Sequence, residues 1–145
     1  MLARLATPLE CAALAELESH HETAAGWGVS GFESEFKQKS CLMLAAVENG
    51  VLCGFICARI LVPELQILNM ACAAPFQRYG VASLLLKDLF SRARTAGCTR
   101  ATLEVRSSNA AALGCYRKAG FQIVGHRPKF YNGTEDAVLM DALLK

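Results

Sequence analysis

The sequence predicts an α/β (α+β) protein in which a mixed central sheet carries helices on both faces. Three observations support this fold class: apolar runs of strand length fill the middle of the chain, a helix-spaced apolar pattern follows them, and strands and helices then alternate. A chain of 145 residues has the size of one domain with its own core. We therefore expect residues 1–145 to form a single domain.

Two helices are expected before the first long strand. The first begins after Thr7, because Thr7 can cap it, Pro8 suits the first helical position and Glu10 completes a capping box. This helix should run to about Ser19. A second helix is expected from residue 30, where two phenylalanines four positions apart share one helix face.

Three strands are expected next. The apolar runs 41–47 and 51–61 flank Asn49-Gly50, and an Asn-Gly pair between apolar runs is a strong hairpin signal. Pro63-Glu64 interrupts the pattern, and a third strand follows over Leu65–Cys72.

The second half alternates helices and strands. Apolar residues from Val81 onward follow helical spacing until Gly97 supplies a stop. The remaining elements expected are a strand at 99–105, a helix at 109–119, and strands at 121–127 and 137–143 around an Asn132-Gly133 turn.

The composition argues against several classes of function. The chain is 53% hydrophobic and 19% charged, and its net charge of +2, without a Lys/Arg run, is too small to indicate a nucleic-acid partner. No apolar stretch of about 18 residues suggests a membrane span, and the first residues lack the apolar region of a signal peptide. We expect a cytoplasmic protein that binds neither nucleic acid nor membrane.

The seven cysteines are many for this length. Their odd number and the lack of a CxxC pair favour neither a disulfide framework nor a zinc site, so no metal is expected. Cys53 and Cys57, four apart on a predicted strand, should point to one side of the sheet. Two sulfurs without a nearby histidine make a poor metal site, and reduced, buried thiols are the simpler interpretation.

A short segment, residues 77–82, joins a predicted strand to a long helix. A loop that opens into a helix presents unpaired N–H groups and the positive end of the helix dipole, which suits phosphate. Gly80 lets the backbone come close to a ligand, and Ala82 is small. Taken alone, the segment could equally be an ordinary connection, since neither G-x-x-x-x-G-K-S/T nor G-x-G-x-x-G is present.

This segment resembles the acetyl-CoA signature Q/R-x-x-G-x-G/A of the GNAT acetyltransferase superfamily. The resemblance implies the GNAT fold, acetyl-CoA as co-substrate, and main-chain contacts between the strand before the loop and the pantetheine arm, as in strand addition. The implied cofactor residues are Met70, Ala71 and Cys72 on the strand, and Gln77, Arg78, Tyr79, Gly80, Val81 and Ala82 around the pyrophosphate.

A second motif follows in the expected order. The pattern Asn109-x-x-Ala112-x-x-x-Tyr116-x-x-x-Gly120-Phe121 matches the family's N-x-x-A-x-x-x-Y-x-x-x-G-F. Asn109 is placed to cap its helix, and the resemblance adds a cofactor contact. Tyr116 alone could be an amphipathic core tyrosine, but two motifs in the right order make that simple interpretation less satisfactory.

The chemistry needs a base for the amine, donors for the oxyanion and an acid for the thiolate. Glu104 lies within an apolar strand, where alternation could also turn it to solvent. The segment 103–112 resembles the ribosomal-protein-alanine N-acetyltransferase (RimI) family. This resemblance implies Glu104 as general base, directly or through water, and Tyr116 as general acid to the CoA sulfur.

The substrate side is less well defined. The tail 131–140 resembles the family's ending, which implies that Tyr131 lines a peptide groove; a hairpin aromatic that packs across strands is the alternative. Trp27 is a second substrate-side candidate, although Gly26-Trp27-Gly28 stands where the family often has Pro-Trp-Ser.

The resemblance implies acetylation of a protein N-terminus, the N-terminal alanine of the eighteenth small-subunit ribosomal protein. An α-amine, with a pKa of about 7.7–8.0 against about 10.4 for lysine, asks less of a single carboxylate. A small-molecule amine or a lysine side chain as acceptor remains an alternative. A non-catalytic acyl-CoA-binding module is the alternative from another class.

Overall fold

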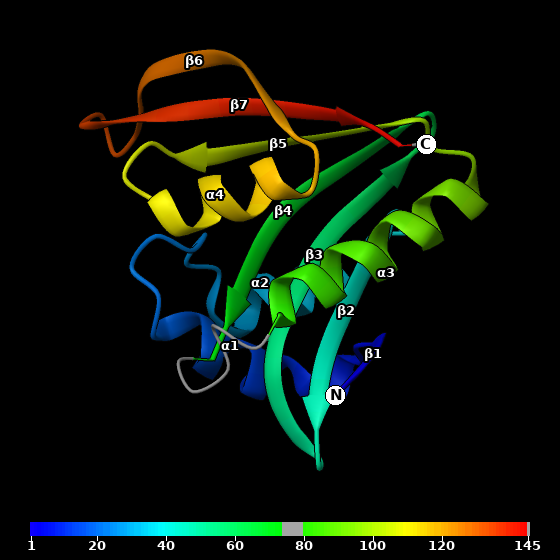
Figure 1. Ribbon diagram of the computed structural model, residues 1–145. Helices are drawn as coiled ribbons and strands as arrows, with labels where there is room; N and C mark the ends of the chain where they lie inside the picture. Colours follow the sequence, from blue (N-terminus) through cyan, green and yellow to red (C-terminus); the bar gives the residue numbers. More distant parts are fainter. Residues whose placement is uncertain (74–79, 145) are drawn as a thin grey trace.

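The computed structural model describes residues 1–73 and 80–144. The described chain forms a mixed sheet of seven strands in the order β1-β2-β3-β4-β5-β7-β6, with helices on both faces (Figure 1). The strands are β1 (Leu2–Leu5), β2 (Cys41–Glu48), β3 (Val51–Leu61), β4 (Glu64–Cys72), β5 (Arg100–Arg106), β6 (Gln122–Tyr131) and β7 (Glu135–Leu143). The helices are the 3-10 helix η1 (Pro8–Glu10), α1 (Cys11–Ser19), α2 (Gly28–Phe36), α3 (Val81–Ala96) and α4 (Ala110–Lys118).

The N-terminal strand β1 was not expected from the sequence. It has only four residues, pairs with β2 antiparallel and lies at the edge of the sheet. A run this short carries too little alternation to be recognised. The helix start that follows is as predicted, since the Glu10 carboxylate accepts the Thr7 N–H at 2.9 Å. Arg4, on β1, binds the same carboxylate at 2.8 Å and joins strand to helix.

Both predicted Asn-Gly turns are present. Asn49 and Gly50 have φ of 51° and 79°, and Asn132 and Gly133 have φ of 53° and 67°. Two consecutive positive φ values match the twist of the flanking strands, so each pair closes a hairpin, β2–β3 and β6–β7.

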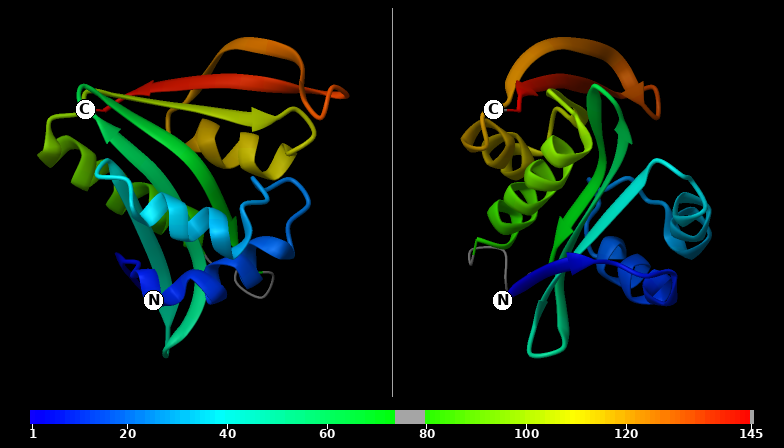
Figure 2. Two further views of the ribbon diagram at one scale, coloured as in Figure 1. Left: turned by 180° about the vertical axis from the view of Figure 1, so that it is seen from behind. Right: turned by 90° about the vertical axis from the view of Figure 1, so that its right-hand side faces the viewer.

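The helices pack on the two faces unequally (Figure 2). Helices α3 and α4 cover one face, where the larger apolar cluster joins helix residues such as Leu85 and Tyr116 to residues of β2, β3, β4, β5 and β7, such as Leu103 and Met140. Helices α1 and α2 cover the other face, where the smaller cluster draws its strand residues from β2, β3 and β4. On the face that carries α1 and α2, strands β5, β7 and β6 therefore contribute no residue to either buried apolar cluster of the described chain.

The expectation that Cys53 and Cys57 point to one side of the sheet was wrong. Cys53 belongs to the larger cluster and Cys57 to the smaller, so the two thiols lie on opposite faces of the sheet. The cause is a β-bulge: Ala46 pairs with Gly54 and Val47 with Leu52, which leaves Cys53 as the extra residue. The bulge shifts the alternation by one position. All seven cysteines are thiols.

The centre of the sheet opens between β4 and β5. These strands run parallel and pair only from Glu64–Arg100 to Ile67–Leu103. Beyond Ile67, β4 continues to pair with β3 as far as Cys72, while β5 pairs with β7 as far as Arg106. One edge of β4 is thus left without a strand partner inside the sheet.

None of the helices in the described ranges has the length and apolar character that crossing a bilayer requires.

Candidate active site

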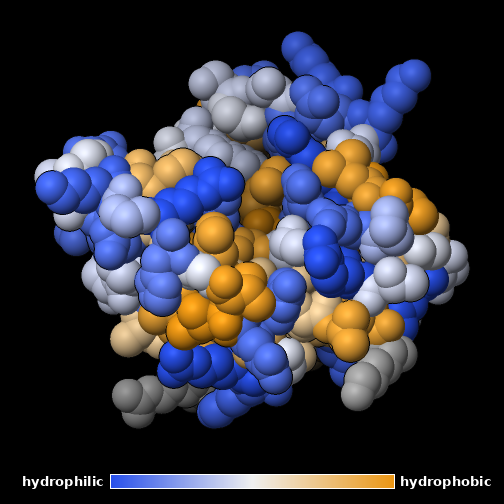
Figure 3. Space-filling view, turned by 90° about the horizontal axis from the view of Figure 1, so that it is seen from above, coloured by the Kyte–Doolittle hydropathy of each residue, from blue (hydrophilic) through white to orange (hydrophobic). Residues whose placement is uncertain are grey.

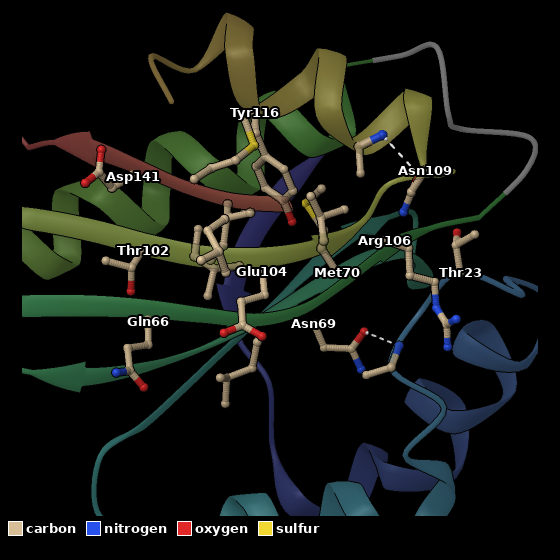
Figure 4. A pocket seen from close by; sticks show the side chains of 18 of the residues that line it. Thr23, Gln66, Asn69, Met70, Thr102, Glu104, Arg106, Asn109, Tyr116 and Asp141 are labelled. Atoms are coloured by element: carbon tan, nitrogen blue, oxygen red, sulfur yellow. Dashed lines mark hydrogen bonds between the residues drawn. The ribbon is translucent and has the colours of Figure 1, made fainter. Parts of the chain in front are cut away.

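A cavity of about 650 Å³ lies where β4 and β5 separate. Its walls come from the α1–α2 loop, both strands, the start of α4 and the β6–β7 hairpin. The view from above shows hydrophobic side chains gathered in separate patches among hydrophilic ones around a hollowed centre (Figure 3). The close-up shows polar side chains from several elements directed into this space (Figure 4).

On the side of β4, the cavity wall is made mainly of backbone. Asn69 and Met70 line it from the open edge of β4, where unpaired main-chain groups can receive an extended, amide-bearing ligand. Two helices begin nearby, α3 after Gly80, which has φ of 74°, and α4 after Asn109. The Asn109 side chain accepts the Ala112 N–H at 3.2 Å, as predicted for a helix cap (Figure 4).

The residues of the predicted pyrophosphate loop are only partly described. Gln77, Arg78 and Tyr79 lie outside the described residues. Val81 is fully buried in the larger apolar cluster, so its side chain holds the start of α3 against the sheet. Ala71 is likewise buried on the opposite face, in the smaller cluster. Any ligand contact of these residues would have to come from their main chains.

Tyr116 reaches the cavity from α4. Its side chain is buried and packs edge-on against Phe121, with ring centroids 5.5 Å apart. Figure 4 shows its hydroxyl directed from the helix into the cavity. Burial raises the pKa of Tyr116 well above its ordinary value, with smaller contributions from the Cys115, Cys72 and Tyr131 side chains. The hydroxyl therefore keeps its proton at neutral pH and can act as a donor.

Glu104 enters the same cavity from the other side of the sheet. Its neighbours Leu103 and Val105 belong to the apolar cluster that includes Tyr116, so alternation turns Glu104 to the opposite face. The carboxylate is about one-third exposed (34%) and lies 3.3 Å from the Arg127 guanidinium. The opening between β4 and β5 brings these two groups, Glu104 and Tyr116, to one space from opposite faces.

A third group of side chains closes the cavity beside the β6–β7 hairpin. The Arg106 guanidinium carbon lies 4.4 Å from the centre of the Tyr131 ring, and its Nη1 is 3.4 Å from Glu135. Glu135 also accepts the Ser108 N–H at 2.8 Å, and hydrogen bonding from Ser108 lowers the pKa of Glu135. Burial raises the pKa of Tyr131, and the negative charge of Glu104 adds to the effect. Tyr131 is therefore a cavity residue, as its substrate-side candidacy required.

Trp27, the other substrate-side candidate, does not line the cavity. Its ring packs edge-on against Phe32, with centroids 5.3 Å apart, in the layer beneath α2. Residues earlier in the same loop, Thr23, Ala24 and Ala25, form the cavity wall instead. Small side chains in a loop give no signal in sequence, whereas the large aromatic attracted the prediction.

Sequence reasoning missed a buried polar pair beside this loop. Glu18 is 3% exposed, and its carboxylate accepts the Asn69 side-chain N–H at 2.7 Å. The same carboxylate accepts the Trp27 and Gly28 N–H groups at 3.0 Å each. A buried carboxylate needs several donors to be tolerated. The sequence did hold a signal, because Glu18 lies four positions after Leu14 and seven after Cys11, on the apolar face of α1.

One set of potential metal ligands lies outside the cavity. Glu35, Cys41 and Cys57 place ligand atoms within 4.8 Å of one another. Both Glu35 oxygens, however, are bound by the Arg59 guanidinium at 2.7–2.8 Å. The arrangement is first an ion pair that anchors α2 to β3, and the expectation of no metal stays a prediction.

Comparison with known proteins gives the class directly. The profile of the Acetyltransferase (GNAT) family matches residues 10–121, and the chain belongs to this family. It has the GNAT fold and is an acetyl-CoA-dependent N-acetyltransferase.

Two proteins of Escherichia coli and Salmonella typhimurium illustrate the likeness. The chain is 31% identical over 117 residues to the ribosomal protein bS18-alanine N-acetyltransferase of E. coli (strain K12), with 79% of this chain and 78% of that protein covered. The crystal structure of the ribosomal-protein-S18-alanine N-acetyltransferase from E. coli superposes with a TM-score of 0.87 at 26% identity, over 99% of this chain and 94% of that one. The putative acetyltransferase yncA from S. typhimurium, solved with its cofactor acetyl-CoA, shares the fold with a TM-score of 0.83 at 22% identity, over 99% and 94% of the two chains.

Proposed function

We propose that this chain transfers the acetyl group of acetyl-CoA to the α-amine of a protein N-terminus, the N-terminal alanine of a small-subunit ribosomal protein, bS18. The observation that carries the proposal is the placement of Glu104 and Tyr116, which enter one cavity from opposite faces of the sheet. The chain would act as a single domain, in the cytoplasm, where ribosomal proteins are made.

The residues on the β4 side of the cavity, the proposed cofactor side, fit acetyl-CoA, which supplies an activated thioester. The edge of β4 beyond Ile67, at Met70 and Ala71, offers main-chain partners to the amides of the pantetheine arm, and Cys72 belongs to the same proposed set. The N-termini of α3, behind Gly80, and of α4, behind Asn109, offer N–H groups and positive dipole ends to anionic groups. Gln77, Arg78, Tyr79 and Ala82 complete the proposed set.

The acceptor would arrive on the face that α1 and α2 leave uncovered. Glu104 takes the proton from the incoming ammonium or amine there, directly or through water. Tyr116 lies on the α4 side, where it donates its proton to the departing sulfur. Each group is suited to its role, because Glu104 has access to solvent while burial holds the proton on Tyr116.

An N-terminal peptide suits the acceptor side better than a compact amine. The cavity extends from the α1–α2 loop past Tyr131 to Gln66 and Asp141, a length of surface that can receive several residues. The choice of bS18 as the acceptor comes from the similar proteins of E. coli, whose names state this substrate. An α-amine also has a lower pKa than lysine, by roughly 2.5 units, so a single carboxylate suffices.

The test is a comparison of three acceptors with purified protein and acetyl-CoA. A six-residue peptide that begins Ala-Arg should gain one acetyl group at its N-terminus, with one thiol released per acetyl group. The same peptide blocked at its N-terminus and carrying a lysine should not react. Faster turnover of the blocked lysine peptide, or of a panel of small amines, would overturn the N-terminal assignment and leave the family assignment intact.

A further inference from the structure

The α1–α2 loop is tied to the cofactor strand through one buried carboxylate. Glu18, near the end of α1, accepts three hydrogen bonds, two from the backbone where the loop enters α2, at Trp27 and Gly28, and one from the side chain of Asn69 on β4. Asn69 also accepts the Ala25 N–H at 3.4 Å, so it holds the loop a second time (Figure 4). We call this set, Glu18, Asn69 and the three backbone N–H groups, the loop clamp.

The clamp fixes a segment that has little else to define its shape. Gly26 and Gly28 have φ of 73° and 65°, and a Cβ atom at either would meet no other atom within 4 Å. A loop with such residues has many accessible conformations. The Glu18 carboxylate stabilises one of them, because any other would leave this buried group without its hydrogen-bond donors.

The position of Asn69 gives the clamp a functional meaning. Asn69 lies on the stretch of β4 that has parted from β5, and it lines the cavity beside Met70. The residues of the clamped loop, Thr23, Ala24 and Ala25, form another wall of the same cavity, on the side that Glu104 faces. One residue therefore joins the strand of the cofactor side to the loop of the acceptor side.

We infer that Glu18 is a positioning residue for the acceptor. Through Asn69 and the backbone N–H groups, it sets the distance between the α1–α2 loop and β4, and so the width of the opening through which the acceptor reaches Glu104. The acceptor role rests on the proposed function; the clamp contacts do not.

The variant Glu18→Gln tests this role, because it keeps the size of the side chain and removes its charge. Its amide can still accept from one of the two backbone N–H groups but turns a donor toward the other. The KM for the acceptor should rise about tenfold or more, since small errors of position are costly in a shaped site. The kcat at saturating acceptor and the Kd for acetyl-CoA should stay within about threefold of the wild type.

The matched control is Glu35→Gln. Glu35 is also buried, 6% exposed, and lies in the same helical layer, but its carboxylate pairs with Arg59 and does not line the cavity. Glu35→Gln should lower the melting temperature without raising the KM for the acceptor. A rise of the acceptor KM in both variants would show a general loss of packing and overturn the inference.

A second pair of measurements does not depend on the acceptor. Hydrogen exchange of residues 20–27 should quicken in Glu18→Gln and stay at the wild-type rate in Glu35→Gln. The double variant Glu18→Gln/Asn69→Asp exchanges donor and acceptor between the two side chains, and should recover part of the KM and of the protection. Unchanged exchange in Glu18→Gln, or no recovery in the double variant, would contradict the clamp.

These measurements separate the two possible failures. If the wild type acetylates no N-terminal peptide, the proposed function fails, and the KM comparison is made with the amine that the enzyme does accept. Quickened exchange in Glu18→Gln with an unchanged acceptor KM would overturn the positioning role alone.

Discussion

The two sides of the cavity differ in whether backbone groups or side chains form the surface. On the cofactor side, the open edge of β4 and the starts of α3 and α4 present backbone groups, and the side chains of Ala71 and Val81 are buried elsewhere. On the proposed acceptor side, side chains form the surface, among them Glu104 beside Arg127 and Tyr131 beside Arg106. A backbone site depends on where the chain runs, whereas a side-chain site depends on which residue stands at each position. The two sides should therefore respond to opposite kinds of substitution.

The largest effect is expected on the acceptor side, from Glu104→Gln. The change removes the proton acceptor and keeps the shape, so kcat should fall about 10²–10⁴-fold, the usual contribution of a general base. Acetyl-CoA affinity measured by calorimetry should stay within about twofold. Equal turnover of variant and wild type would remove Glu104 from the mechanism and show that the acceptor side does not depend on this side chain.

A somewhat smaller effect is expected for Tyr116→Phe, the side chain that reaches across from the cofactor side. Loss of the donor should lower kcat about 10²-fold while the ring still packs against Phe121. Because burial raises the pKa of Tyr116, the wild-type rate should not fall from this residue between about pH 8 and 10, where an ordinary tyrosine begins to ionise. A rate that declines in this range in the wild type and not in Tyr116→Phe would show that the hydroxyl titrates normally.

The backbone side should instead be sensitive to a single added methyl group. A Cβ atom at Gly54 would lie 2.8 Å from Val81 Cγ1 and 3.0 Å from the Ala71 carbonyl oxygen. Gly54→Ala should push the start of α3 away from β3, cost about 1–3 kcal/mol of unfolding free energy and weaken acetyl-CoA binding.

Gly114→Ala is the control for that substitution. In α4 a Cβ atom at Gly114 would meet nothing within 4 Å, so alanine should stabilise the protein by about 0.5–1 kcal/mol. Thermal unfolding and calorimetry of both variants measure the contrast. Equal stability of the two variants would mean that the approach of α3 to β3 is not tight.

The smallest effect is expected for Asn109→Ala. The Asn109 side chain caps α4 through the Ala112 N–H, and losing such a cap costs about 1 kcal/mol. Asn109→Asp keeps an acceptor at the cap and should retain most of the stability, while its negative charge should disfavour an anionic ligand at this helix end. Unchanged acetyl-CoA affinity in the aspartate variant would place the cofactor away from the start of α4.

The contrast between the two sides also explains what the sequence could reveal. The alternation of elements, both Asn-Gly hairpins and the Asn109 cap follow from local rules, and the structure confirmed each of them. Small residues and a fixed order of motifs in the sequence indicate the proposed cofactor side. Glu104 and Tyr116 are candidates through the family resemblance, and strand alternation and helix position explain why both line one cavity.

The parts that sequence could not reveal depend on long-range placement. Cys53 changed faces because a β-bulge inserts one residue, and no local pattern marks where a bulge will fall. Trp27 was the substrate-side candidate of the α1–α2 loop, whereas Thr23, Ala24 and Ala25 line the cavity. Glu18 became significant only through Asn69, which is 51 residues away in the chain.

The short pairing of β4 with β5 has a consequence for cooperativity. Among the described residues, four strand pairs, Glu64–Arg100 to Ile67–Leu103, join the first half of the sheet to the second. Acetyl-CoA bound as proposed along the open stretch beyond them would connect the two halves of the sheet. Each tenfold excess of free acetyl-CoA over its Kd should then add about 1.4 kcal/mol to the stability of the folded chain. Hydrogen exchange of the β4 and β5 amides should depend on acetyl-CoA more than exchange elsewhere in the sheet. The stability of the connection between the two halves would then follow the acetyl-CoA concentration in the cell.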